Sequence, residues 1–254
     1  MDALPLQLFA ELNRETLREI APTTLVVLPL GATEQHGPHL PSGTDTFAVE
    51  SIARDSALIA GDQIPIALTL PLSFGSSVHH LVYGATLSLS TETYYKVLCD
   101  LLDSLVQDGF MRIFLLNGHG GNHELAQIAA RDIALRQPVR VAAGSYWAIA
   151  WDALTEAGAH KKRRLPGHAG DFETSLMLSL RPDLVSALRP RRDTFSSSDP
   201  RRFESAWRHE KHGFWTDIEG FTDSPDQALA ERGAEFRRVI CSEVAKALVE
   251  FYEI

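Results

Sequence analysis

One short stretch of the sequence concentrates side chains that could bind a metal ion. Glu34, His36 and Asp45 lie in a segment rich in Gly and Pro that directly follows an apolar run at 24–30. In an extended loop, Glu34 and His36 point to the same side, and the following turns allow Asp45 to return to them. Mixed imidazole and carboxylate ligands suit Zn²⁺, Mn²⁺ or Fe²⁺ better than Ca²⁺ or copper. The alternative is a local structural role for each: a turn cap, a buried imidazole and a helix cap.

A second polar cluster, Asn117-Gly-His-Gly-Gly-Asn122, follows another apolar run and precedes a helical pattern. Glycines let the backbone approach a ligand closely, and amides at a helix N-terminus favour anions. His119 could complete a metal site, and we predict that Gly120 and Asn122 contact the substrate. The alternative is a phosphate-binding loop in a non-catalytic nucleotide or sugar-phosphate module. The cluster lacks the lysine of a P-loop and the spacing of a dinucleotide fingerprint.

A third cluster places His168 in a loop flanked by glycines and Glu173 in the first turn of a predicted helix. The functional interpretation makes Glu173 a metal ligand and His168 a proton carrier. Spacing alone does not separate it from a helix-dipole role for Glu173. We also predict that His80 and Trp147 contact the substrate, although Trp147 fits an aromatic core equally well. For the other nearby histidines, support of ligands is favoured over ligation: His39, His79 and His123.

Predicted strands alternate with predicted helices along most of the chain. The strands are expected at 24–30, 64–72, 111–116 and 139–143, and the helices at 45–60, 94–110, 124–136, 172–180 and 228–252. This order predicts an α/β fold, a three-layer sandwich with a mainly parallel central sheet and ligands at the carboxyl ends of its strands. No Pro, Ser and Gly-rich linker divides the chain, so we expect one domain over residues 1–254. An irregular arginine-rich segment at about 184–225 is predicted to be a long loop or lid.

Composition excludes several classes of partner. Lys and Arg number 24 against 33 Asp and Glu, and the net charge of −9 disfavours binding to nucleic acid or anionic membranes. Two cysteines, Cys99 and Cys241, are too few for a disulfide scaffold or a thiolate zinc site, so we expect buried free thiols. No apolar run is long enough to span a bilayer, and the first residues lack a basic signal-peptide region. We therefore expect a cytoplasmic enzyme with a small-molecule substrate.

The three clusters, in this order along the chain, resemble the creatininase family. They read Gly-Ala-Thr-Glu34-Gln-His36 to Asp45, Asn117-Gly-His119-Gly-Gly-Asn122, and His168-Ala-Gly-Asp-Phe-Glu173-Thr-Ser. The resemblance implies an α/β fold, a homo-oligomer that is usually a hexamer, and two adjacent divalent metal ions that activate a water. Zn²⁺ is our first choice, with Mn²⁺ or Fe²⁺ as alternatives. By the same resemblance, Glu34 and His119 hold one ion, His36 holds the other, Asp45 bridges both and His168 exchanges protons with the substrate.

The sequence departs from creatininase itself at two places. Creatininase has Asn-Gly-His-x-Glu where this chain has Gly121 in the position of the glutamate, and Glu173 is our candidate for the missing ligand. The Trp-Asp pair that contacts creatinine is not present in residues 161–166. We therefore expect hydrolysis of a C–N bond in a small cyclic amide or formamide other than creatinine. The alternative is hydrolysis of a C–C bond in a cyclic polyol ketone.

Overall fold

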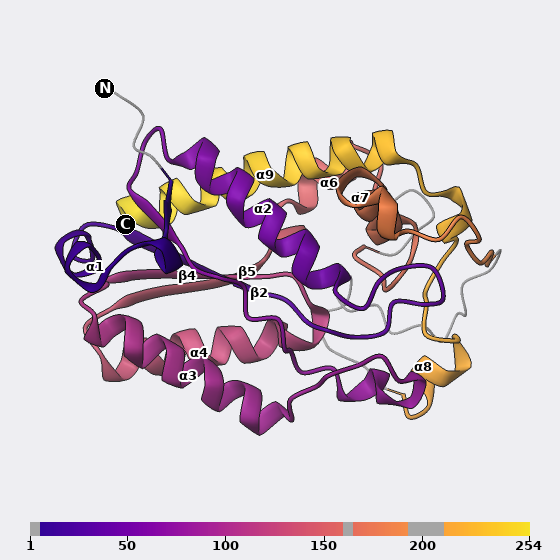
Figure 1. Ribbon diagram of the computed structural model, residues 1–254, viewed down its shortest axis with the longest axis horizontal. Helices are drawn as coiled ribbons and strands as arrows, with labels where there is room; N and C mark the ends of the chain where they lie inside the picture. The colour runs from indigo at the N-terminus through magenta and orange to yellow at the C-terminus, as the bar shows by residue number, and fades with distance from the viewer. Residues whose placement is uncertain (1–5, 160–164, 193–210) are drawn as a thin grey trace.

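A central sheet of five parallel strands organises the chain, with strand order β1-β3-β2-β4-β5. The computed structural model describes residues 6–159, 165–192 and 211–254. The strands are β1 (Gln7–Leu8), β2 (Leu25–Leu30), β3 (Ile66–Leu68), β4 (Arg112–Asn117) and β5 (Arg140–Ser145). Helices cover both faces of this sheet, α2 and α9 on one side and α3 and α4 on the other (Figure 1). The predicted three-layer α/β sandwich is therefore confirmed, and every pairing in the sheet is parallel.

Strand β2 is buried along its whole length, as its apolar sequence predicts. It pairs with β4 in a register that sets Leu25 opposite Arg112 and Leu30 opposite Asn117. The two strands therefore end side by side at the same edge of the sheet. This register brings the loop that begins at Gly31 next to the loop that contains His119, because Gly118 N donates to Leu30 O at 2.8 Å.

The helices form two layers. Their bounds are α1 (Arg14–Ile20), α2 (Thr44–Ala60), α3 (Thr91–Gln107), α4 (His123–Arg136), α5 (Tyr146–Ile149), α6 (Trp151–Glu156), α7 (Asp171–Leu180), α8 (Phe214–Asp217) and α9 (Ala230–Glu253). One core cluster joins Val49 of α2, Phe172 of α7 and Phe236 of α9 to one face of the sheet. Residues of α3 and α4 pack on the other face in a second cluster. The layer that contains α2 and α7 also carries Asp45 and Glu173.

Five 3-10 helices complete the regular structure of the described residues. They are η1 (Phe9–Glu11), η2 (Val78–Tyr83), η3 (Gly120–Asn122), η4 (Pro182–Leu184) and η5 (Pro225–Gln227). At the carboxyl end of the sheet, η2 lies beside α8 (Figure 1), where the Tyr83 hydroxyl donates to Trp215 O at 2.9 Å. In the described part of the chain, no helix is long and apolar enough to cross a membrane.

The structure corrects several sequence-based boundaries. The strand expected at 64–72 is only Ile66–Leu68, because prolines at 65 and 71 flank it and cannot donate to a ladder. The sequence patterns did not predict β1, α1, α5 or α6; Asn13 caps the N-terminus of α1. Cys241 is buried as expected, whereas Cys99 is only half-buried. The segment at 184–225 is not wholly irregular, since it contains α8. Residues 193–210, with three of its six arginines, lie outside the described residues, so a lid there stays a prediction.

A substitution at Gly233 would test how closely α9 packs on α7. A Cβ at this position would lie 1.8 Å from Ser175 O, a clash with backbone. We expect Gly233→Ala to lower the free energy of unfolding by about 1–3 kcal/mol, because overpacking outweighs the gain of about 1 kcal/mol in helix propensity. Urea unfolding measures this change in the free energy of unfolding. Ala234→Ser, at the exposed neighbouring position, should change stability by less than about 0.5 kcal/mol. A Gly233→Ala protein as stable as the parent would contradict the packing.

Candidate metal centre

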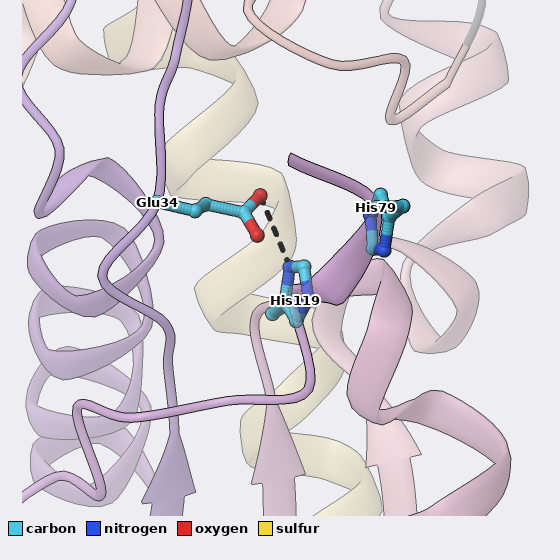
Figure 2. Close-up of side chains that lie close together, drawn as sticks. All are labelled: Glu34, His79 and His119. Carbon is cyan, nitrogen blue, oxygen red and sulfur yellow. Dashed lines mark ion pairs between the residues drawn. The ribbon is translucent and has the colours of Figure 1, made fainter. Parts of the chain in front are cut away.

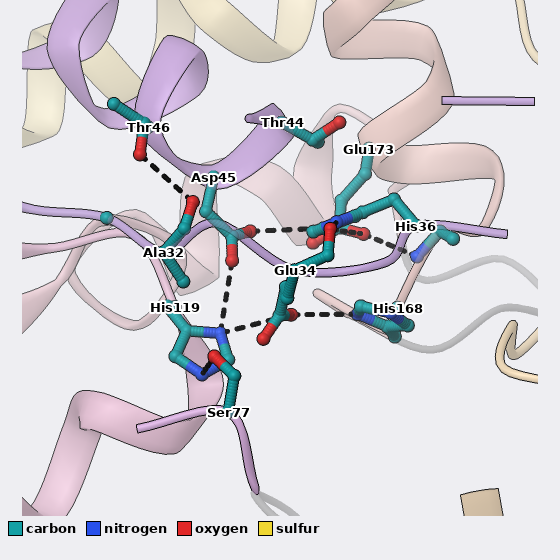
Figure 3. A network of polar contacts seen from close by, with 12 residues as sticks. Ala32, Glu34, His36, Thr44, Asp45, Thr46, Ser77, His119, His168 and Glu173 are labelled. Atoms are coloured by element: carbon teal, nitrogen blue, oxygen red, sulfur yellow. Dashed lines mark hydrogen bonds and ion pairs between the residues drawn. The ribbon is translucent and has the colours of Figure 1, made fainter. Parts of the chain in front are cut away.

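Asp45 lies between two histidines at the carboxyl end of the sheet (Figure 3). Its Oδ1 is 3.2 Å from His36 Nε2, and its Oδ2 is 3.1 Å from His119 Nδ1. Glu34 Oε1 is 3.3 Å from the same His119 nitrogen. The loop from β2 brings these side chains together because Glu34 N donates to Ser42 O at 2.9 Å, so the chain turns back before α2 begins. The structure thus gathers the four residues that the sequence places in two separate clusters.

Backbone carbonyls fix which ring nitrogen of each histidine faces the carboxylates. His36 Nδ1 lies 3.1 Å from Glu34 O, and His119 Nε2 lies 3.2 Å from Ser76 O. A carbonyl only accepts hydrogen bonds, so these nitrogens carry the hydrogen and donate. When these imidazoles are neutral, as metal-binding histidines are, the lone pairs of His36 Nε2 and His119 Nδ1 point at the carboxylates. This is the orientation that a carbonyl partner gives to a metal-binding histidine.

Glu173 adds a third carboxylate beside His36. Its Oε2 is 3.8 Å from His36 Nε2 and accepts a hydrogen bond from Ala169 N. At residue 121 the backbone leaves no room for a side chain, because a Cβ on Gly121 would lie 2.1 Å from Ser76 O. A carboxylate near His36 therefore comes from α7 and not from the loop after β4.

Buried atoms without hydrogen-bond partners converge at this place. Among the described residues, both Glu34 carboxylate oxygens, Asp45 Oδ2 and His36 Nε2 have none. Two ligand sets here are Glu34 with His36 and His168, and His36 with Asp45 and Glu173; in each set the ligand atoms lie within 4.8 Å of one another. Buried polar atoms normally have partners, so the donor set and its unpartnered atoms fit divalent cations.

Electrostatics leads to the same conclusion. Burial lowers the pKa of His36, but Asp45, Glu173 and Glu34 together raise that pKa to about 10. The pKa of His119 is likewise raised well above its ordinary value, because Glu34 and Asp45 outweigh burial. Burial raises the pKa of Glu173 to about 8. Without a metal, protons on the imidazoles offset the buried carboxylates, and bound cations would take over that role.

His168 faces the same cluster from the loop before α7. Its Nε2 lies 2.9 Å from Gln35 O, so this nitrogen carries the hydrogen, and its Nδ1 is 3.5 Å from Glu34 Oε1. The pKa of His168 is lowered well below its ordinary value by burial and by the histidines around it. A neutral imidazole thus presents a lone pair to the carboxylate cluster.

A pocket opens over this centre. Glu34, Asp45, His119, His168 and Glu173 line it, together with three residues predicted to contact substrate: His80, Gly120 and Trp147. Asn122, also predicted to contact substrate, does not line it. Its amide Nδ2 donates to Gly31 O at 3.0 Å, and its Oδ1 accepts from Ser76 N at 3.0 Å. Both ends of the buried amide hold neighbouring loops together, so contact between Asn122 and a substrate stays a prediction.

Two pocket residues were missed as functional candidates. His79 of η2 and Trp215 of α8 both line the pocket. The Trp215 ring centroid is 4.5 Å from that of His80 and 5.3 Å from that of His168. His79 was assigned only a supporting role, and Trp215 lies in a segment without any period that could have indicated it.

The remaining candidates lie around the centre. His39 Nε2 is 3.0 Å from Thr174 Oγ1, next to Glu173, and burial lowers the pKa of His39 to about 4. His123 Nδ1 is 2.7 Å from the buried Ser145 hydroxyl, on the side of α4. Residues 161–164, a basic run before His168, lie outside the described residues.

Comparison with known proteins decides the family. A family model described as creatininase, creatinine amidohydrolase, matches residues 10–248. The chain belongs to the creatininase family. The resemblance found in the sequence is therefore confirmed.

Several curated proteins are similar to this chain. A mycofactocin precursor peptide peptidase from Mycobacterium ulcerans is 32% identical over 181 residues, 69% of this chain and 66% of that relative, so the chain spans slightly less than two thirds of it. A creatinine amidohydrolase from Pseudomonas putida is 32% identical over 184 residues, 66% of this chain and 68% of the relative. A 3-dehydro-scyllo-inosose hydrolase from Thermotoga maritima is 27% identical over 183 residues, 70% and 57% of the two chains.

Solved structures agree with this assignment. A structure described as creatininase Mn superposes with a TM-score of 0.79 at 26% identity, covering 97% of this chain and 98% of that chain. A mutant creatininase of Zn–Zn type gives a TM-score of 0.74 at 26% identity, with the same coverage. Creatininase structures thus contain divalent metals, and the described residues of this chain include sets that could hold them.

Proposed function

We propose that this protein is a metal-dependent hydrolase that cleaves a C–N bond in a small amide other than creatinine. Asp45 carries the proposal, because its two oxygens face His36 on one side and His119 on the other. Glu34 and His119 would hold one divalent ion, His36 and Glu173 a second, and Asp45 both. Zn²⁺ suits this donor set best, with Mn²⁺ or Fe²⁺ as alternatives. Such a pair of ions supplies an activated water and polarises a carbonyl.

The protein's own residues would position and protonate the substrate. The carbonyl of Gln35 holds the hydrogen of His168 on Nε2, so Nδ1 can accept a proton and then donate it to the leaving nitrogen. The Gly120 backbone, which lines the pocket, would stabilise developing negative charge. Trp215 packs its ring edge-on against His80 and His168 and limits the movement of both imidazoles.

A second candidate function is hydrolysis of a C–C bond in a cyclic polyol ketone. The 27% identical inosose hydrolase favours it, and the same donor set could polarise a ketone. The metal-loaded protein should be offered small cyclic amides, formamides, short peptides and cyclic polyol ketones. We expect release of an amine, or of formate from formamides. Ring opening of a polyol ketone with no cleavage of any amide would transfer the assignment to the second candidate.

Substitutions of Glu173 and of His168 should have different effects. We expect Glu173→Ala to lower bound metal from two ions towards one per chain, because it removes a carboxylate that no residue at 121 can replace. His168→Ala should keep both ions and lose about 10²–10⁴-fold in turnover, as expected for a proton carrier. Metal analysis and steady-state kinetics measure the two effects. Glu92→Ala, at an exposed position on α3, is the control. Unchanged metal content in Glu173→Ala would remove Glu173 from the proposed ligand set.

We also propose that copies of this chain associate through the segment at 70–87. This segment exposes apolar side chains at Leu70, Phe74, Val78, Leu81, Val82 and Leu87. No Asp, Glu, Lys or Arg occurs anywhere in residues 63–91. Exposed apolar patches depleted of charge are typical of interface centres. A second copy is the occupant that this surface fits best, because an uncharged apolar face is complementary to itself.

Charges placed on this segment should dissociate the assembly. Leu81 is 51% exposed and Val82 is 65% exposed, so Leu81→Glu with Val82→Glu should not disturb the core. We expect the parent to run as an oligomer in size-exclusion chromatography with light scattering, and the double variant to shift to the mass of one chain. Leu135→Glu, 78% exposed on α4, is the matched control and should keep the parental mass. A monomeric parent, or a double variant of parental mass, would contradict the interface.

A further inference from the structure

His79 lies close enough to the metal centre to act as a ligand (Figure 2). One ligand atom from each of Glu34, His79 and His119 lies within 4.8 Å of the other two. The three side chains come from separate elements: Glu34 from the loop after β2, His119 from the loop after β4, and His79 from η2. None of the motifs that indicated the metal site includes residue 79.

The local structure positions the His79 ring. It is parallel to the His119 ring within 5°, with ring centroids 6.0 Å apart. The centroid of the His79 ring is 4.2 Å from that of His80 and 5.2 Å from that of Trp215, so aromatic contacts help to hold the His79 ring in place. The start of η2 is itself close to the centre, because the Ser77 hydroxyl lies 3.2 Å from His119 Nε2. His79 is thus a half-buried ring held at the pocket wall.

The two halves of the centre differ in the ligands that they offer. His36, Asp45 and Glu173 supply one imidazole and two carboxylates. On the other side, His119 Nδ1 faces the carboxylates of Glu34 and Asp45, and both oxygens of the buried Glu34 lack a hydrogen-bond partner among the described residues. With the imidazole of His79, an ion beside His119 would have four protein ligands, whereas an ion beside His36 would have three. Four protein ligands are typical of a closed zinc site, and three leave a position open for water or substrate.

We propose that His79 is the fourth protein ligand of the ion held by Glu34, Asp45 and His119. This inference rests on the proposed metal-dependent function. It assigns unequal roles to the two ions: a closed position with two imidazoles beside His79, and an open position with one imidazole beside Glu173. A second imidazole favours Zn²⁺ over Mn²⁺ at the closed position, because imidazole suits Zn²⁺ and carboxylates suit Mn²⁺.

Replacement of the imidazole by a ring without ligand atoms tests the assignment. His79→Phe keeps aromatic contacts with His80 and Trp215 but cannot bind a metal. Chelator competition with Zn²⁺ should show that one of the two ions binds at least about tenfold more weakly than in the parent. With Co²⁺, the visible absorption typical of a four-coordinate site should decrease. Affinity for Mn²⁺ should change less. His212→Phe, at an exposed position outside the ligand sets, is the control.

The outcomes separate this inference from the proposed function. A parent protein that binds no metal after reconstitution overturns the metal-dependent function itself. A parent that binds two ions, with unchanged Zn²⁺ affinity and Co²⁺ spectrum in His79→Phe, overturns only the ligand role of His79. Should His79→Phe fail to fold by circular dichroism, His79→Gln takes its place under the same criterion. The amide oxygen of Gln should retain Mn²⁺ binding better than Zn²⁺ binding.

Discussion

The structure depends on the burial of three carboxylates at the carboxyl end of one parallel sheet. Glu34, Asp45 and Glu173 are each less than 10% exposed, and a buried carboxylate is costly unless a positive partner offsets it. Imidazoles supply that partner. Backbone carbonyls accept hydrogen bonds from the ring nitrogens that face away from the carboxylates, His36 Nδ1 and His119 Nε2. The β2–β4 register, the turn before α2 and the position of α7 all serve to bring these charges together. Cations in the same place would satisfy the carboxylates.

The missing glutamate at residue 121 has a consequence beyond one ligand. Ser76 O occupies the space that a Cβ on Gly121 would need, so the loop after β4 and the loop before η2 approach each other closely. That approach places the Ser76 carbonyl on His119 Nε2. The carboxylate on the His36 side then comes from α7, which packs on α9 through Gly233. The candidate metal centre is therefore coupled to the helix layer on one face of the sheet.

Periodicity in the sequence predicted the main strands, the long helices and the sheet end that carries the site. It also indicated Glu34, His36, Asp45 and His119, because their spacing and their position after buried strands are local properties. His79 and Trp215 could not be found in this way, since their neighbours are distant in sequence and no motif includes them. Asn122 shows that the same local pattern also has a structural explanation. Its position between glycines and a helix suggested a ligand contact, whereas its amide holds Gly31 O, 91 residues away.

Glu34 Oε1 is shared by three imidazoles, at 3.3 Å from His119, 3.5 Å from His168 and 3.6 Å from His80. A cation held by Glu34 and His119 would offset the charge of this carboxylate in place of the imidazoles. His168 then differs from the ligand histidines in one respect. Its pKa is lowered by burial and by the surrounding histidines, whereas the pKa values of His36 and His119 are raised. An imidazole that stays neutral beside bound cations can take up a proton during a reaction and give it back, which is why His168 suits proton transfer better than ligation.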